Sequence, residues 1–317
     1  MTQLETQVLG TGAAALADAA QLLGQGRLVS FPTETVYGLG ADATNDRAVA
    51  SIYQAKGRPS FNPLIIHLAD STQVSRYCRM TETAARLADA FWPGALTLVL
   101  PLQPAAGISK LVTAGLDTVA VRVPDHHVAT AILRGIDGPV AAPSANPSGR
   151  VSPTTAAHVL GGLGGRIDAV VDGGVCAVGL ESTIVDCSGA QPMLLRAGGI
   201  PTEAIEACLG GPLGTAPVKE TPNAPGQLTS HYAPLGSMRL SAWPPLPHET
   251  SLGFGDVDAD LNLSPSGDLT EAAANLFALL HELDRRGAKH IAVAPIPDHG
   301  LGAAINDRLR RAAAPRD

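Results

Sequence analysis

Apolar residues up to position 208 follow two different spacings. At residues 13–23, 46–54, 81–91 and 126–133 they recur every three or four positions, which predicts amphipathic helices with one buried face. Short apolar runs of strand length lie among them, at residues 27–31, 63–68, 95–102, 118–124, 139–144, 168–174, 182–187 and 192–196. Such alternation is typical of a sheet covered by helices, so we expect an α/β fold.

The segment 209–234 breaks both spacings. It is rich in proline and glycine, which predicts a connector, yet it ends in the dense cluster APGQLTSHYAP that a plain spacer would not need. Beyond it, strand-like runs at 238–243, 251–256 and 290–297 and helical patterns at 269–286 and 303–313 predict a second, smaller α/β domain. We therefore expect a domain at 1–212, a linker at 213–234 and a small domain at 235–317.

The composition is that of a globular protein with a large core. The 317 residues are 45% apolar and 16% charged. No run approaches the roughly 18 apolar residues of a membrane span, and the first residues, MTQLETQ, lack the features of a signal peptide. We expect a cytoplasmic protein without membrane contact, whose four cysteines form no CxxC pair and stay reduced. The net charge of −7 argues against a protein whose main task is to clamp nucleic acid.

The familiar phosphate-binding signatures are missing. The chain contains no Gly-Lys dipeptide, which excludes a Walker A loop. The string GTGAAA at 10–15 imitates a dinucleotide fingerprint, but only a two-residue apolar run precedes it, so we interpret it as the beginning of a helix. Four aspartates could contribute to a metal site but lack ligand spacing, and no protein-held metal is expected: Asp42, Asp46, Asp172 and Asp186.

Two loops that flank strands offer groups for an anion. In KGRPSFNP, Lys56 and Arg58 stand two residues apart on a segment constrained by glycine and proline. A solvated loop is the simpler alternative. However, the loop APSANPSG at 142–149 also follows an apolar run and presents small donors. Because ligands bind at strand ends in α/β sheets, the two loops predict one shared cleft.

Several polar residues lie inside or at the ends of predicted strands. His67 interrupts LIIHLAD, and Arg122 interrupts VAVRVP, where an unpaired guanidinium would be costly to bury. Either an anionic ligand or an internal carboxylate must satisfy Arg122. Ser182 and Arg196 stand at strand termini, and the stretch FPTETVYGLG at 31–40 packs several hydroxyls beside a strand end.

These motifs, in this order and spacing, resemble the YrdC-like domain of threonylcarbamoyl-AMP synthases. The resemblance covers residues 10–234 and rests on FPTETVYGLG, KGRPSFNPLIIH, FWPGALTLVL, VAVRVP, APSANPSG, ESTIVD, LLRAGG and the linker APGQLTSHYAP. It implies a YrdC-like twisted mixed sheet flanked by helices, a lid-like linker and a smaller Rossmann-like C-terminal domain. Glu34, where many members have aspartate, and Gln227-Leu228 depart slightly from the pattern.

The resemblance also implies a reaction. The family joins L-threonine, bicarbonate and ATP to threonylcarbamoyl-AMP and releases pyrophosphate, with magnesium carried by ATP. Downstream transferase proteins then modify tRNA, with which the enzyme itself would make at most weak contact. The residues implied to bind threonine are Thr35, His67, Arg122, Ala142 and Ser182; those implied for ATP are Lys56, Arg58, Asn62, Thr118, Ser144, Asn146, Ser152, Arg196 and Tyr232. Lys56 and Arg58 would also be catalytic, by stabilising phosphate charge. His67 is the nearest candidate for a general base.

Two other functions remain open. YrdC-like domains form a concave surface with basic residues, so a module that binds double-stranded RNA or tRNA without synthase activity is the main alternative; tight, salt-sensitive binding without ATP consumption would indicate it. The other is a relative that uses carbamoyl phosphate instead of threonine. The linker and the C-terminal domain argue against it, because that relative carries other domains.

Overall fold

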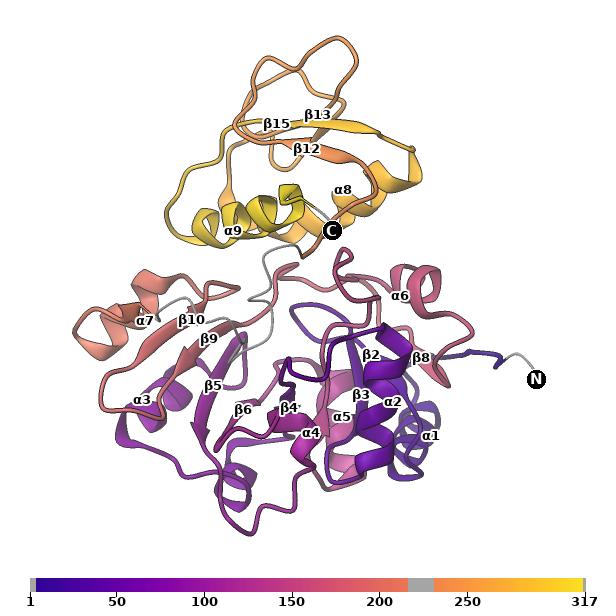
Figure 1. The fold of residues 1–317 in the computed structure, drawn as a ribbon, viewed down its shortest axis with the longest axis vertical. Coiled ribbons are helices and arrows are strands. Elements are labelled where there is room, and N and C mark those ends of the chain that lie inside the picture. The colour runs from indigo at the N-terminus through magenta and orange to yellow at the C-terminus, as the bar shows by residue number, and fades with distance from the viewer. Residues whose placement is uncertain (1–3, 216–230, 316–317) are drawn as a thin grey trace.

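A computed structural model describes residues 4–215 and 231–315, which form a larger and a smaller α/β part (Figure 1). In the larger part the helices are α1 (Ala13–Gly24), α2 (Asp46–Lys56), α3 (Glu82–Phe91), α4 (Lys110–Thr113), α5 (His127–Ile136), α6 (Ala156–Leu163) and α7 (Thr202–Leu209), with a short 3₁₀ helix at Ser71–Arg76. Its strands are β1 (Gln7–Leu9), β2 (Val29–Phe31), β3 (Gly38–Asp42), β4 (Ile65–His67), β5 (Leu96–Pro101), β6 (Thr118–Arg122), β7 (Val140–Ala141), β8 (Ala169–Val171), β9 (Thr183–Asp186), β10 (Met193–Arg196) and β11 (Gly214–Thr215).

Within residues 4–215 these strands form one eleven-stranded mixed sheet. Their order is β1-β8-β2-β3-β7-β4-β6-β5-β9-β10-β11. Neighbours β4 and β6 are parallel, whereas β3 and β7, β7 and β4, and β5 and β6 are antiparallel. The predicted mixed sheet flanked by helices is therefore confirmed. The domain boundaries stay a prediction, because most of the predicted linker lies outside the described residues.

Local capping explains where the helix before the first anion loop begins and ends. The Asn45 side chain accepts hydrogen bonds from the N–H groups of Arg47 and Ala48, which caps the start of α2. Gly57 follows its last residue with φ of 60°, a left-handed conformation that glycine adopts without strain. Lys56 and Arg58 are thus presented from either side of a sharp helix end. As interpreted from the sequence, Gly12 begins helix α1.

The two faces of the sheet have different neighbours. Side chains alternate along a strand, so Ile66 of β4 enters the main core while Ile65 and His67 face the other side. On that other face lies a small apolar cluster formed by Ile65, Val99, Ala120, Ile184 and Leu195. His67 and Arg122 are paired neighbours on β4 and β6. This face of the sheet therefore presents the polar His67 and the cationic Arg122 beside a small apolar cluster.

The smaller part is a parallel sheet covered on one side by two helices. Within residues 231–315 the strands β12 (Ser237–Arg239), β13 (Thr250–Gly253), β14 (Leu261–Asn262) and β15 (His290–Val293) have the order β12-β15-β13-β14. Helices α8 (Leu269–Arg285) and α9 (Leu301–Ala313) lie between this sheet and the larger part (Figure 1). Their core includes Leu276 and Phe277 and continues into Leu180 and Tyr232, so the two parts share one apolar cluster.

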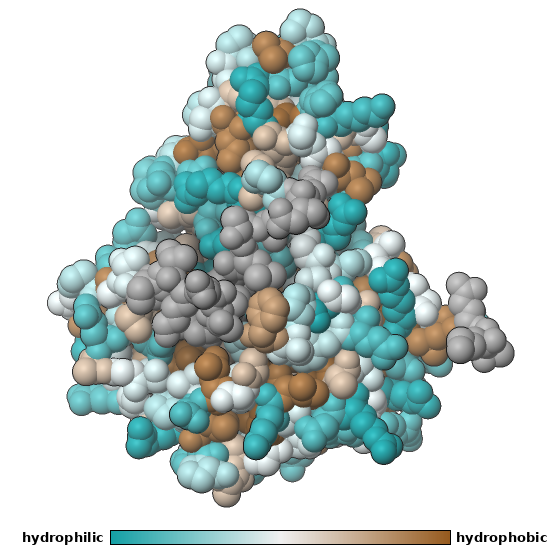
Figure 2. Space-filling view, viewed as in Figure 1, coloured by the Kyte–Doolittle hydropathy of each residue, from teal (hydrophilic) through white to brown (hydrophobic). Residues whose placement is uncertain are grey.

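Polar residues cover most of the visible surface of both parts, and apolar residues lie in separated patches (Figure 2). No helix within the described ranges has the length and apolar character needed to cross a bilayer. All four cysteines are free thiols, as predicted; Cys78, Cys176 and Cys187 are buried, and burial raises the pKa of each to about 12.

Two stacked histidines lie where the parts meet. The rings of His158 on α6 and His281 on α8 have centroids 3.9 Å apart. His281 Nε2 donates to the Ser152 carbonyl at 3.1 Å, and Thr154 N–H donates to His158 Nδ1 at 3.3 Å. Burial and the facing His281 lower the pKa of His158 from 6.5 to about 4. Both rings are therefore held in their neutral forms at neutral pH.

This contact predicts a pH-dependent stability. Because the folded-state pKa of His158 lies below its unfolded value of 6.5, the unfolded chain binds the proton more readily between pH 6.5 and about 4. The His158 contribution is fully present above this window and is lost as pH falls through it. We expect the Tm of His158→Phe to fall less than that of wild type on acidification, measured by scanning calorimetry. Replacement of the exposed His127 by Phe is the control, and parallel pH profiles for all three proteins would contradict the expectation.

Candidate active site

A small cavity of about 40 Å³ lies over the face of the sheet that carries His67 and Arg122. Its walls come from strands β4 and β6, the loop after β7, the ends of β9 and β10, and the described end of the linker. The predicted site residues that line it are Arg58, His67, Arg122, Ala142, Ser144, Ser182, Arg196 and Tyr232. Val36, Ile65, Pro143, Glu181 and His231 complete the lining. Segments far apart in the sequence thus meet at one site.

Most hydroxyls of FPTETVYGLG build the turn itself. Thr33 Oγ1 donates to the Val36 carbonyl at 2.7 Å and accepts from the N–H of Thr35. Tyr37 Oη donates to the Gly174 carbonyl at 2.7 Å. Thr35 is fully buried, and its Oγ1 lies 2.8 Å from that of Thr33. Thr33 and Tyr37 therefore have structural roles, and Thr35 is the hydroxyl of this turn that stays a candidate for a ligand.

Lys56 links the two anion loops. Its Nζ donates to the backbone carbonyls of Ser144 and Asn146, both at 2.5 Å. Burial, followed by the neighbouring charge of Arg58, lowers the pKa of Lys56 well below its ordinary value. An ammonium has three donors, so two of them shape the 142–149 loop and one remains for a ligand. The shared cleft inferred from the two loops is present.

Arg58 and Asn62 form a second buried polar group. Arg58 Nη2 donates to the carbonyls of Asn62 and Pro63 at 3.3 and 2.9 Å, which holds the guanidinium in the cavity wall. The pKa of Arg58 is lowered to about 10, chiefly by burial. The Asn62 side chain is 1% exposed, yet neither its oxygen nor its nitrogen has a hydrogen-bond partner within the described residues. A buried amide of this kind is suited to a ligand that pairs with it.

An internal carboxylate accompanies Arg122. Arg122 Nη2 lies 2.7 Å from Glu34 Oε1, and Arg122 Nε donates to the Gly94 carbonyl at 3.3 Å. The sequence left open an anionic ligand or an internal carboxylate, and the structure contains the internal carboxylate. His67 is 3% exposed, and burial together with Arg122 lowers its pKa to about 3. His67 is therefore a neutral ring that can donate or accept one hydrogen bond.

The opposite wall is built from the ends of β9 and β10. Arg196 Nη2 donates to the Ser182 carbonyl at 2.8 Å and to Ser182 Oγ at 3.2 Å. Ser182 Oγ also lies 2.7 Å from Thr97 Oγ1. Ser152, which is wholly buried, donates to Glu181 Oε1 at 2.5 Å. Glu181 was not predicted as a site residue, because in the sequence it is merely a polar residue before a strand.

His231 and Tyr232, at the described end of the linker, cover this cavity. They are 6% and 1% exposed, and Tyr232 adopts a left-handed φ of 61°. Burial, then the charges of Arg58 and Lys56, lower the pKa of His231 well below its ordinary value. The polar residues His231 and Tyr232 of the linker motif thus lie over the cavity.

The site holds more buried positive charge than negative charge. Its cations are Lys56, Arg58, Arg122, Arg196 and Arg308, against the carboxylates of Glu34, Glu181 and Asp307. Further buried polar atoms of this region, apart from the Arg122–Glu34 ion pair, have no hydrogen-bond partner in the described residues: they lie on Asn62, His67, Asn146, His231, Tyr232 and Arg308. This excess of buried positive charge among the described residues, together with the buried polar atoms that lack a partner there, favours an anionic, polar ligand.

Some predicted residues lie outside the cavity lining. Thr118 is at the amino-terminal end of β6, about 13 Å along the strand from Arg122 at roughly 3.3 Å per residue. Thr35, Lys56, Asn62, Asn146 and Ser152 also lie outside this lining; Lys56 and Ser152 hydrogen-bond to the lining residues Ser144 and Glu181, and Asn146 lines a neighbouring cavity. Within the described residues, no group of His, Cys, Asp or Glu side chains is placed to hold a metal ion. Two further residues escaped sequence analysis: His231, and Arg308 from a helix in which basic residues suggest only a solvated face.

Family models match nearly the whole chain. Residues 21–198 match the Sua5/YciO/YrdC model, described as telomere recombination. Residues 200–314 match the C-terminal domain of threonylcarbamoyl-AMP synthase.

Curated relatives agree with both matches. The threonylcarbamoyl-AMP synthase of Bacillus subtilis is 43% identical over 98% of this chain and 96% of its own length. That of Pyrococcus abyssi is 41% identical and covers 94% of each chain. The crystal structure of P. abyssi Sua5 complexed with L-threonine superposes with a TM-score of 0.90, at 39% identity, over 97% of this chain and 98% of that chain. The chain therefore belongs to the Sua5/YciO/YrdC family, among the threonylcarbamoyl-AMP synthases that carry the additional C-terminal domain.

Proposed function

We propose that this chain condenses L-threonine, bicarbonate and ATP to threonylcarbamoyl-AMP and releases pyrophosphate, as a nucleotidyltransferase. Its relatives of similar length are named for this product, and a structure 39% identical to it is described as a complex with L-threonine. The observation that carries the proposal is the buried cluster of cations and unpartnered polar atoms at the positions of the family motifs. Such a cluster suits substrates that bring carboxylate and phosphate charge.

Threonine would bind over β4 and β6. Arg122 would pair with its carboxylate, and Glu34 holds that guanidinium in place from the other side. Ala142 N–H already donates to the Ile65 carbonyl at 3.0 Å, so the Ala142 carbonyl is the backbone group that would accept from the threonine amine. Thr35, His67 and Ser182 would contact the remaining polar atoms of the amino acid. A neutral His67 would donate or accept a hydrogen bond without adding charge.

ATP would bind beside the threonine, along the two anion loops. Lys56, Arg58 and Arg196 would neutralise phosphate charge, and Asn62, Thr118, Ser144, Asn146 and Ser152 would supply hydrogen bonds. Magnesium would arrive bound to the polyphosphate. Ligand pockets usually enclose about 300–1,000 Å³, whereas this cavity measures about 40 Å³. Binding therefore requires the site to open, and His231 and Tyr232, which lie over the cavity, would act as part of a lid that excludes water from the adenylate.

The chemistry needs no covalent enzyme intermediate. The threonine amine condenses with bicarbonate to a carbamate and one water, and a carbamate oxygen then attacks the α-phosphorus while pyrophosphate leaves. The chain's own contribution is to hold the reactants in line and to stabilise the charge that develops on phosphate. Arg58, held by two backbone carbonyls, is preorganised for this task. The product is a reactive adenylate, which we propose is consumed by a transferase that modifies tRNA.

Pyrophosphate release from ATP tests the proposal directly. We expect release in bicarbonate buffer when L-threonine is supplied, and background release when threonine or bicarbonate is omitted. The other nineteen amino acids, added singly, are the controls for the pocket. Pyrophosphate release that does not depend on threonine would refute the assignment. Absence of release together with tight, salt-sensitive tRNA binding would favour the RNA-binding alternative.

A further inference from the structure

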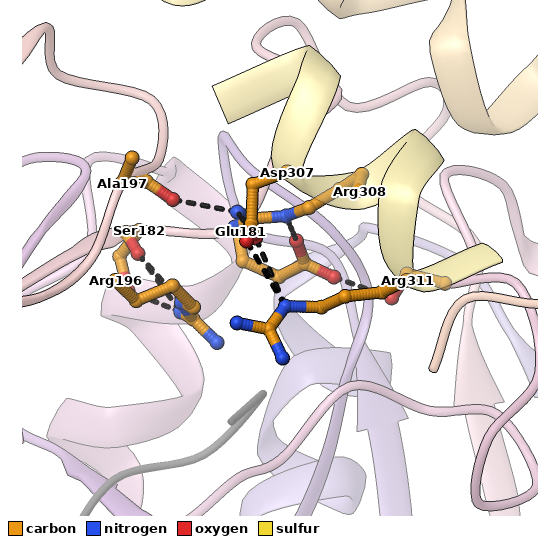
Figure 3. Close-up of polar contacts among 8 residues, drawn as sticks. Glu181, Ser182, Arg196, Ala197, Asp307, Arg308 and Arg311 are labelled. Atoms are coloured by element: carbon orange, nitrogen blue, oxygen red, sulfur yellow. Dashed lines mark hydrogen bonds and ion pairs between the residues drawn. The ribbon is translucent and has the colours of Figure 1, made fainter. Parts of the chain in front are cut away.

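One side chain of the smaller part reaches the wall of the cavity. Arg308 projects from α9 and is 0% exposed. Its Nε donates to Glu181 Oε2 at 3.0 Å, and its Nη1 donates to the Ala197 carbonyl at 2.6 Å (Figure 3). Nη1 also donates to Asp307 Oδ2 at 3.0 Å, and the other oxygen of Asp307 accepts from Arg311. Arg308 is thus fixed on its own helix and bound to two residues of the catalytic part.

Glu181 depends on this contact. It lines the cavity and is 6% exposed, and its other oxygen accepts the hydrogen bond from Ser152. A carboxylate that lost Arg308 would be a buried, unpaired negative charge in a site for phosphate, which is strongly unfavourable. Arg196, whose guanidinium is bound to Ser182, is another cation of this wall, and the charge of Glu181 already acts on it (Figure 3). An unpaired Glu181 would therefore attract Arg196 away from the ligand and repel the phosphates.

Arg308 also contacts the tyrosine of the lid. Its Cζ lies 5.3 Å from the centroid of the Tyr232 ring, a distance typical of a cation–π contact. On α8, Phe277 stacks on the same ring at 5.7 Å. Tyr232 is thus packed against both helices of the smaller part when it covers the cavity.

We propose that Arg308 is a positioning residue through which the C-terminal domain sets the nucleotide affinity of the catalytic domain, by neutralising Glu181 in the cavity wall and seating Tyr232. The inference rests on the proposed function for the identity of the nucleotide. It explains why helix α9 of the smaller domain contributes a buried arginine to this site. It also makes a specific prediction. Loss of Arg308 should weaken ATP binding because Glu181 is left unpaired, so removal of both charges should restore ATP binding.

Calorimetric titration of ATP into the full-length chain tests this. We expect the Kd for ATP to rise at least about tenfold in Arg308→Met, because a buried charge is left unpaired. In Arg308→Met with Glu181→Gln we expect the Kd to return to within about threefold of wild type. Arg308→Lys keeps the charge without the planar fork and should lie between wild type and Arg308→Met. Arg310→Met, an exposed arginine on the same helix, is the matched control and should bind ATP like wild type.

The kinetics separate positioning from general damage. Arg308→Met should raise the KM for ATP far more than it lowers kcat, whereas partial unfolding would lower kcat and leave KM unchanged. An unchanged Kd in folded Arg308→Met would overturn the inference. So would a double variant that binds ATP no better than Arg308→Met. A wild-type protein that binds ATP but releases no pyrophosphate would refute the proposed function alone, since the Kd comparison does not depend on turnover.

Discussion

In Arg122→Met, kcat/KM for threonine is expected to fall about 10²- to 10³-fold. Arg122 is the cation that stands beside His67 on the face of the sheet over which the cavity lies. Met removes the partner of the substrate carboxylate and at the same time leaves Glu34 buried without its ion pair. The expected loss is mainly in threonine KM, because the missing interaction acts on the bound substrate as well as on the transition state.

A second replacement distinguishes substrate binding from stability. Glu34→Gln added to Arg122→Met removes the unpaired carboxylate and should recover most of the lost Tm, while threonine KM stays high. This differs from the Arg308 and Glu181 pair, where the double variant should recover ligand binding itself. Steady-state pyrophosphate release and scanning calorimetry on the same preparations give both readouts. Recovery of threonine KM in the double variant would mean that Arg122 has only a structural role.

In Arg58→Met, kcat is expected to fall about 10²- to 10³-fold, the size seen when one preorganised donor to developing charge is removed. The guanidinium is held by the Asn62 and Pro63 carbonyls, so it needs no reorganisation when phosphate charge builds up. Threonine affinity should change little, because Arg58 lies on the nucleotide side of the proposed site. Single-turnover pyrophosphate release and threonine titration measure the two effects separately.

Arg58→Lys and Arg47→Met are the controls for this prediction. Lysine keeps the charge but cannot bond two carbonyls and a ligand in one plane, so it should recover only part of the rate. Arg47 is exposed near the start of α2, the helix that precedes Arg58, and its replacement should leave kcat unchanged. Wild-type turnover in Arg58→Met would remove this residue from the catalytic group.

Sequence reasoning located the cavity residues through the positions of polar groups at strand ends. Arg122 and His67 interrupt apolar runs, and polar groups in such places need partners whatever the fold. The long helices were predicted within a few residues, since their apolar spacing spans several turns. Short elements such as β3, α4 and β11 escaped, because a few residues carry no periodicity of their own.

The amino-acid sequence by itself determined the α/β class and the second domain, because both depend on the local spacing of apolar residues. It also determined the group of cations and hydroxyls beside the strands, because buried charge is costly and needs a partner. Tertiary structure alone decided which charges are partnered. Glu34 comes to Arg122 across 88 positions of the chain, and Arg308 comes to Glu181 across 127. No local pattern encodes such pairs, since they form only when the sheet and the smaller part bring distant segments together. Lys56 and the threonines of the turn also could not be assigned from the sequence alone. Some of their hydrogen-bond donors hold the fold together and others are left for a ligand, and only the packed structure determines which.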